Sequence, residues 1–114
     1  MSSMNGVHLI GRLTRDTELR YTKNGKAVSS FGLAINEKYK SGDEWKTDVA
    51  YVEIVTWEKL AEACAEHLKK GSLVGISGKL KYESWETDDG GKRNKLEVVA
   101  IKVAFLDKKE SSDE

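Results

Sequence analysis

Alternating apolar and polar residues predict that most of this chain is β-strand. Phe31, Leu33 and Ile35 alternate with small or polar residues, the pattern of a strand that buries one face. Comparable patterns predict four further strands, over residues 7–13, 48–57, 73–82 and 96–106. Polar segments rich in turn-forming residues separate the strands, at Asn24-Gly25, 40–47 and 87–93. So many short strands in a short chain favour a small barrel or sandwich.

A helical period replaces the alternation between residues 59 and 70. The apolar residues of this segment are spaced for one face of a helix: Leu60, Ala61, Cys64, Ala65 and Leu68. Gly71 follows and is expected to end the helix. The predicted order is therefore three strands, one helix and two strands. This order is typical of an all-β fold, the five-stranded Greek-key OB-fold barrel, with one α-helix between the third and fourth strands.

Length, cysteine content and charge are those of one small intracellular domain. The 114 residues can form one core without metals or disulfides, and the single cysteine excludes an intrachain disulfide. No run approaches the roughly 20 apolar residues of a membrane-spanning helix, so we expect a soluble protein without a membrane partner. The 19 basic and 19 acidic residues cancel, but acids gather at the end of the chain. We therefore expect a domain over residues 1–106 and a short polar acidic tail over 107–114.

The residue types that perform catalysis do not converge in this sequence. His8 and His67 are the only histidines, and neither has a nucleophile or a metal ligand at a useful spacing. Cys64 lies on the apolar face of the predicted helix, where a packed thiol is expected rather than a nucleophile. We expect no enzymatic activity, no metal and no cofactor.

Two aromatic side chains are predicted on the face of a strand that turns away from the core. Tyr51 and Trp57 share one parity of the strand over residues 48–57, and the apolar core face has the other. Exposed aromatics beside lysines can stack unpaired bases, with about 1–3 kcal/mol per base and little sequence preference. Packing against another subunit explains the same pattern equally well.

Other aromatic and basic residues allow the same two explanations. Trp85 follows Lys79 and Lys81 into a polar, glycine-rich segment, where it either contacts a ligand or folds onto its own barrel. Tyr39 stands between two lysines and presents the same choice. Further basic residues that could contact phosphates are Lys59, Lys69, Lys70, Lys92 and Arg93.

Short motifs along nearly the whole chain resemble those of the bacterial single-stranded DNA-binding protein family. They are NGVHLIGRL, DTELRY, NGKAV, WEKLAE, LKKGS and ISGKL, beginning at residues 5, 16, 24, 57, 68 and 76. The resemblance implies an OB-fold homotetramer that binds single-stranded DNA with little sequence preference. Such a protein protects the strand and removes its secondary structure during replication, recombination and repair, in the cytoplasm at the nucleoid.

The resemblance also implies site residues. Bases would stack at positions that match Tyr39, Tyr51, Trp57 and Trp85. Phosphates would contact positions that match Lys59, Lys69, Lys70, Lys81 and Arg93, and Lys79 lies beside this set. Arg20 and Tyr21 match a turn of the family.

Departures from the family pattern affect charge and partners. Glu53 and Glu83 stand where relatives can carry arginine, so each removes a phosphate contact and is expected to repel the strand locally. The acidic tip with which relatives recruit replication and repair proteins has no counterpart after Leu106, so these proteins remain possible partners but without that recruiting tail. Three alternatives remain: a primosomal OB protein, which the predicted helix disfavours, an RNA-binding OB module, and a barrel that binds only proteins.

Overall fold

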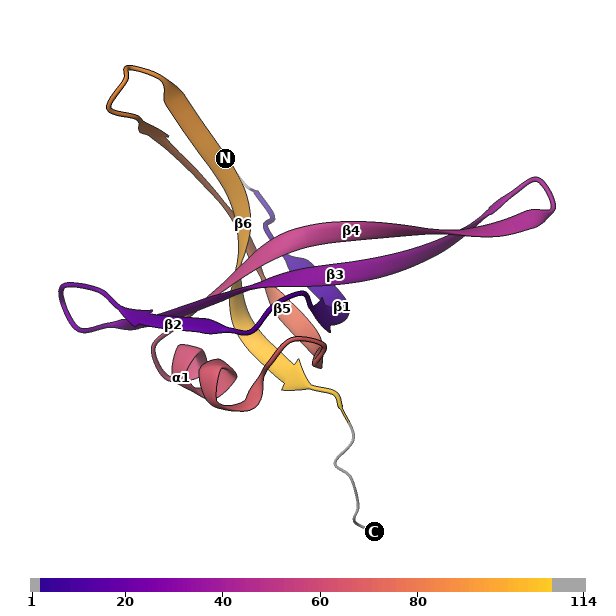
Figure 1. Cartoon of the computed structure of the whole chain (residues 1–114), viewed down its shortest axis with the longest axis horizontal. Helices are drawn as coiled ribbons and strands as arrows, with labels where there is room; N and C mark the ends of the chain where they lie inside the picture. Colours follow the sequence, from indigo (N-terminus) through magenta and orange to yellow (C-terminus); the bar gives the residue numbers. More distant parts are fainter. Residues whose placement is uncertain (1–2, 108–114) are drawn as a thin grey trace, which may run out of the picture.

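Six strands and one helix make up residues 3–107, the part of the chain that the computed structural model describes (Figure 1). In chain order they are β1 (Val7–Leu13), β2 (Glu18–Tyr21), β3 (Ala27–Ser41), β4 (Glu44–Trp57), α1 (Glu58–His67), β5 (Leu73–Glu86) and β6 (Lys92–Phe105). Helix α1 has 10 residues, and no helix in this described part is long and apolar enough to cross a membrane.

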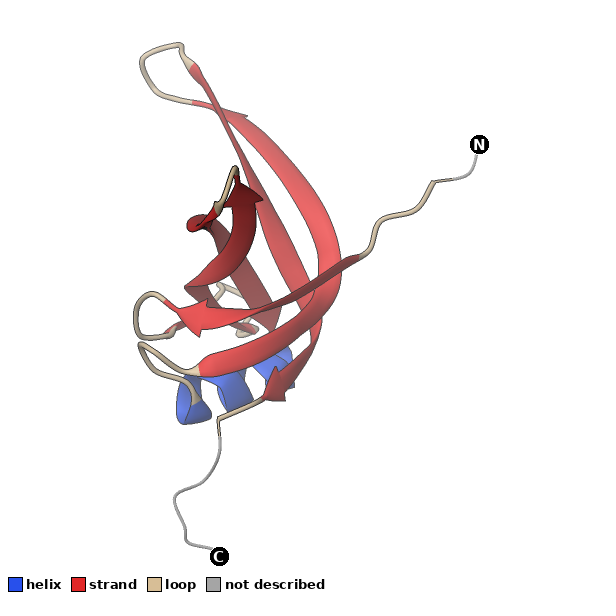
Figure 2. Cartoon of the chain, turned by 90° about the vertical axis from the view of Figure 1, so that its right-hand side faces the viewer, coloured by secondary structure: helices blue, strands red, loops and turns tan. Residues whose placement is uncertain are grey.

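Five of the strands close into a barrel because β1 pairs on both of its edges. Strand β1 is antiparallel to β5 along most of its length, and its end pairs with β3, where Arg12 lies opposite Ala34. A short parallel contact joins β4 to β6, with Ile54 opposite Val98. The order around the barrel is β1-β3-β4-β6-β5, which confirms the predicted OB-fold. Helix α1 contacts β2, β3 and β4 and lies at one end of the barrel (Figure 2).

Strand β2 is a feature that the sequence pattern did not predict. Among the described strands it pairs only with β3. Because β2 is an additional strand, α1 follows the fourth strand of the chain instead of the third. Arg20 and Tyr21 belong to this strand, and the turn comes after them, where the Thr22 N–H donates to the Lys26 carbonyl. All four residues of β2 are exposed, and a strand without a buried face shows no clear apolar alternation.

Two hairpins extend from the barrel in different directions (Figure 1). The segment 40–47, predicted to be a turn, is mostly strand: β3 and β4 pair as far as Ser41 and Glu44, and Gly42 has a φ of +65°. Strand β5 likewise continues to Glu86, so Trp85 lies on a strand rather than in a loop. Beyond the barrel both faces of a ribbon meet solvent, so strand pairing there needs no apolar residues.

The core is formed by inward-facing residues of the strands and by the apolar face of α1. Phe31, Leu33, Ile54, Val74 and Val98 are almost completely buried. Cys64 and Leu68 close the end of the core from the helix side, as the helical spacing predicted. The helix itself ends at His67, three residues before the predicted end, because Leu68 adopts an extended conformation.

Burial makes the thiol of Cys64 unreactive. Its burial raises the thiol pKa to about 11 from an ordinary value of 9.0, opposed in part by a hydrogen bond with Thr56. We expect no reaction with iodoacetamide at pH 8 in the folded protein and rapid reaction in urea. The raised pKa stabilises the fold fully below pH 9 and less as the pH rises towards 11. Equal labelling rates with and without urea would contradict this burial.

Candidate nucleic-acid interface

A charged groove crosses the outer faces of β2, β3, β4, β6 and β5. The strand register builds it, since Val28 lies opposite Trp57 on the neighbouring strand and Lys81 lies opposite Glu97. Its volume is about 420 Å³. The groove is lined by Arg15, Glu18, Arg20, Val28, Ser30, Glu53, Val55, Trp57, Lys81, Glu83, Lys95, Glu97 and Val99.

Trp57 is the aromatic residue of this groove. It is the last residue of β4, and its indole is partly exposed, with 37% of its surface accessible. The same side chain borders a second depression, which it shares with Lys79, Lys81 and Tyr82. The structure therefore brings together three of the predicted site residues, Trp57, Lys79 and Lys81. Tyr82 was not predicted, although its place beside Lys81 could have suggested it.

The two predicted tyrosines lie on opposite faces of the β3–β4 hairpin. Tyr51 pairs with Ala34 and shares the outer face with Trp57, as the alternation predicted, and 73% of its surface is exposed. Tyr39 pairs with Lys46 and has the parity of the core residues Phe31 and Leu33, but it lies beyond the barrel and is exposed. Only Tyr51 continues the face that carries the groove.

Trp85 and Arg93 form a cross-strand pair on the β5–β6 hairpin. They are directly opposite each other, so their side chains share one face, and that face also carries Lys79 and Lys81. Trp85 is half-exposed and borders a small depression with Lys92. This hairpin thus extends the face of the groove away from the barrel.

Ion pairs occupy most of the charges in the groove. Lys95 lies 3.4 Å from the buried Glu97 and 3.9 Å from Glu83, which also pairs with Lys81 at 3.3 Å. The lining holds four basic and four acidic side chains, so its formal charge is zero. A polyanion therefore meets little net attraction inside the groove, and the aromatic surface has to supply more of any affinity for nucleic acid there.

Arg15 is a groove residue that sequence reasoning missed. Its two terminal nitrogens donate to the two carboxylate oxygens of Glu53, at 3.2 and 2.8 Å. This hydrogen bond raises the pKa of the Arg15 guanidinium above its ordinary value, although burial acts in the opposite direction. Glu53 was expected to face the DNA alone, and instead it is neutralised. The two residues are 38 positions apart, and no local pattern could have paired them.

The three lysines predicted around the helix are not part of the groove lining. Lys59 is exposed in the first turn of α1, two residues after Trp57. Lys69 and Lys70 follow the helix at its other end, where the Lys70 N–H donates to Asp16 at 2.8 Å and the Gly71 N–H donates to Leu13. These lysines border the end of the barrel that α1 closes.

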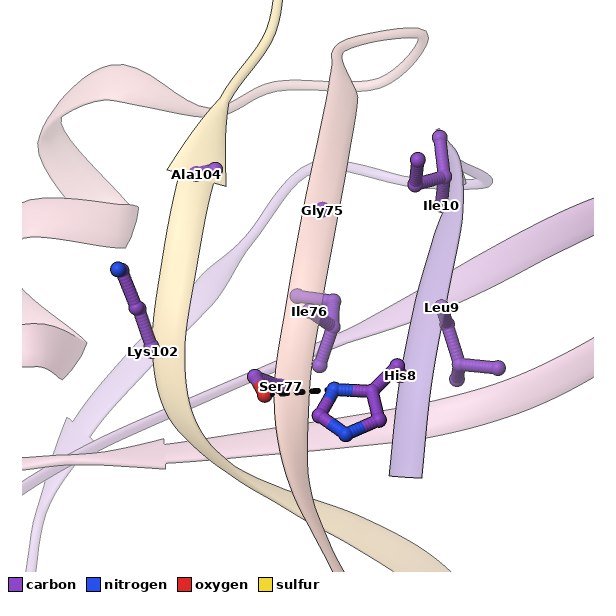
Figure 3. A pocket seen from close by; sticks show the side chains of 8 residues that line it. All are labelled: His8, Leu9, Ile10, Gly75, Ile76, Ser77, Lys102 and Ala104. Atoms are coloured by element: carbon purple, nitrogen blue, oxygen red, sulfur yellow. Dashed lines mark hydrogen bonds between the residues drawn. The ribbon is translucent and has the colours of Figure 1, made fainter. Parts of the chain in front are cut away.

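An apolar patch covers another face of the barrel, over β1, β5 and β6 (Figure 3). Ile10 is 62% exposed there, and the ring of His8 forms a hydrogen bond with Ser77 at 2.8 Å. The patch is a shallow depression of about 450 Å³. Its lining residues are His8, Leu9, Ile10, Gly75, Ile76, Ser77, Lys102 and Ala104.

Comparisons with known proteins agree with this architecture. A solved structure, the Plasmodium falciparum SSB complex with ssDNA, superimposes with a TM-score of 0.85 at 25% sequence identity, over 94% of this chain and 98% of that one. The single-stranded DNA-binding protein of Caldanaerobacter subterraneus is 46% identical over 93% of this chain and 70% of its own length. That of Treponema pallidum is 42% identical over 93% of this chain, which spans only 60% of the Treponema protein.

The family assignment rests on the whole barrel and not on one motif. Residues 4–106 match the model of the single-strand binding protein family, a range that contains all six strands and the helix. The chain therefore belongs to the single-strand binding protein family.

Proposed function

We propose that this protein binds single-stranded DNA with little sequence preference and does so without catalysis. The observation that carries the proposal is the position of Trp57, a partly exposed indole beside Lys79 and Lys81 on the face of the groove. Unpaired bases stack on such a surface, and a duplex cannot offer them. The names of the bacterial relatives and the DNA complex of the Plasmodium protein support the same ligand.

The strand would follow the outer face from one hairpin to the other. Tyr51, Trp57 and Trp85 are exposed along this face and supply the stacking surfaces. Arg93 and the lysines beside these aromatics contact phosphates, and Lys59, Lys69 and Lys70 do so where the strand passes α1. Tyr39 contacts a base only if the strand wraps around the edge of the β3–β4 hairpin. In the cell, such binding protects single strands and removes their hairpins during replication, recombination and repair, in the cytoplasm at the nucleoid.

The apolar patch favours assembly into a homotetramer. Exposed Ile10 and the flat surface around Gly75 would bury apolar area against a second copy. The edge of β1 also supports this, because within residues 3–107 the segment 7–11 pairs only with β5, on one side. A tetramer would join four weak sites into one surface of higher avidity. Replication and repair proteins are further partners, although the tail predicted over 107–114 lies, apart from Asp107, outside the described residues.

Titration of the protein with labelled oligo-dT at two salt concentrations, on a sample of measured mass, tests the proposal. Fluorescence anisotropy should show saturable binding that weakens with salt, and log K should fall against log salt by about 0.7 for each phosphate neutralised. Oligo-dT should compete better than duplex DNA or an RNA of equal length. Failure to bind any single strand would contradict the proposal, and stronger competition by RNA would favour an RNA-binding module.

A further inference from the structure

The Arg15 side chain is fixed in place across the groove. Both ends of its guanidinium bind the Glu53 carboxylate, so the planar group is held by two parallel hydrogen bonds. It passes over Gly32, which pairs with Glu53, and a Cβ on that glycine would lie only 3.0 Å from the Arg15 Nη1 atom. The absence of a side chain at residue 32 therefore leaves space that the Thr14 hydroxyl and the guanidinium share.

The pair of Arg15 and Glu53 lies in the row of exposed aromatics. Glu53 is two residues from Tyr51 and four from Trp57 on β4, so all three side chains leave the same face of the strand. Tyr51 and Glu53 are separated by roughly 7 Å along the strand, and Glu53 and Trp57 by roughly 13 Å. The side chains of Arg15 and Glu53 remain 40% and 38% exposed. A strand that contacts both aromatics has to cross this pair.

We propose that Arg15 is a further base-stacking platform of the groove, and that Glu53 is the residue that positions it. The inference rests on the proposed function, since it assigns a role within the same site. A guanidinium is planar and stacks on nucleobases as aromatic rings do. The Glu53 carboxylate binds the edge of the Arg15 guanidinium and neutralises its charge. The flat face of the guanidinium therefore remains to contact DNA.

Stacking and phosphate binding by Arg15 predict different salt dependence. A phosphate contact releases counterions and adds about 0.7 to the slope of log K against log salt, whereas stacking on a neutralised pair adds almost nothing. Stacking and phosphate binding also predict different effects of replacing Arg15 with lysine. A lysine keeps the positive charge but has no planar group that can stack on a base. The Glu53 carboxylate already neutralises Arg15, so the structure favours stacking.

Three variants test the role of Arg15 and Glu53, with anisotropy on labelled oligo-dT at several salt concentrations. Arg15→Lys, which keeps the charge, should weaken binding by about fivefold and leave the slope unchanged. Arg15→Ala should weaken binding at least as much, because it also leaves the Glu53 carboxylate without its partner. Arg15→Lys should not weaken binding to an abasic oligomer of equal length, which has phosphates but no bases. Glu53→Gln should free the charge of Arg15 and steepen the slope by about 0.7.

Arg12→Ala is the matched control, because the Arg12 guanidinium pairs with Asp107 and the Gly71 carbonyl, outside the groove. It should bind oligo-dT like the parent. Parental affinity in Arg15→Lys would overturn the proposal in favour of a phosphate contact. An unchanged slope in Glu53→Gln would overturn the positioning role. If the parent protein itself binds no oligomer, the proposed function fails. That result differs from the two results that would overturn the roles of Arg15 and Glu53.

Discussion

Replacing Trp57 with alanine should weaken the binding of oligo-dT by roughly tenfold or more, because a stacked base contributes about 1–3 kcal/mol. Trp57 borders both depressions of the outer face and lies where β4 meets α1. No other aromatic side chain of the described residues lines the charged groove. Its loss therefore removes the stacking surface nearest to Lys79 and Lys81 and leaves a groove with no net charge.

Trp57→Phe serves as the control for this result. Phenylalanine keeps a π-face of smaller area, so the loss of affinity should be a fraction of that in Trp57→Ala. Anisotropy of a labelled oligomer measures both variants without depending on tryptophan fluorescence, and thermal unfolding verifies that each is folded. Parental affinity in both variants would mean that bases do not stack on this indole.

Substitution of Gly78 by alanine should lower the free energy of unfolding by about 2–3 kcal/mol and the Tm by roughly 10–20 °C. Gly78 lies on β5 between Val7 of β1 and Ala100 of β6, at a shift in strand register. A Cβ at this residue would overlap the Val99 carbonyl oxygen and lie 2.9 Å from the Ala100 Cα. Both are backbone atoms of a paired strand, so they can move only if β5 and β6 separate locally.

Gly75→Ala, in the same strand, tests whether crowding rather than the loss of a glycine causes the effect. A Cβ there would meet only the side chains of Leu106, Ala104 and Ile10, at ordinary distances of 3.6–3.9 Å. Its effect on unfolding in urea should be small. Because Gly75 lies in the apolar patch, unfolding should be measured at several protein concentrations. Equal destabilisation in the two variants would contradict the role given to the backbone contact at Gly78.

Alternation along the chain predicted the barrel and its outer aromatic face because both depend on local periodicity. Phe31 and Leu33 are buried and Tyr51 is exposed, as the parity of their strands requires. The lengths of the two hairpins were underestimated for the same reason. Strand pairing beyond the barrel leaves polar residues on both faces, so these segments show no apolar alternation. Helix α1 was overestimated by three residues, because Lys69 and Lys70 suit a helix C-terminus whether or not the chain is still helical there.

The charges of the groove could not be predicted from the sequence. Glu53 and Glu83 look like repulsive groups when each position is considered alone. Their partners are set by strand register and by the loop after β1, which brings Arg15 over Gly32. Tyr39 illustrates a related limit: its lysine neighbours suggested a nucleic-acid contact, but only the register shows that it leaves the opposite face from Tyr51.

The parallel contact between β4 and β6 has a consequence for how quickly the protein folds. Ile54 and Val98 are 44 positions apart in the sequence, and Leu9 and Ile76 of the β1–β5 pair are 67 apart. Closing the barrel through such distant pairings requires long loops to close first, and comparable small barrels fold in milliseconds to seconds. On the ribosome, the groove can form only after β6 has been synthesised, so a nascent chain acquires its complete site last.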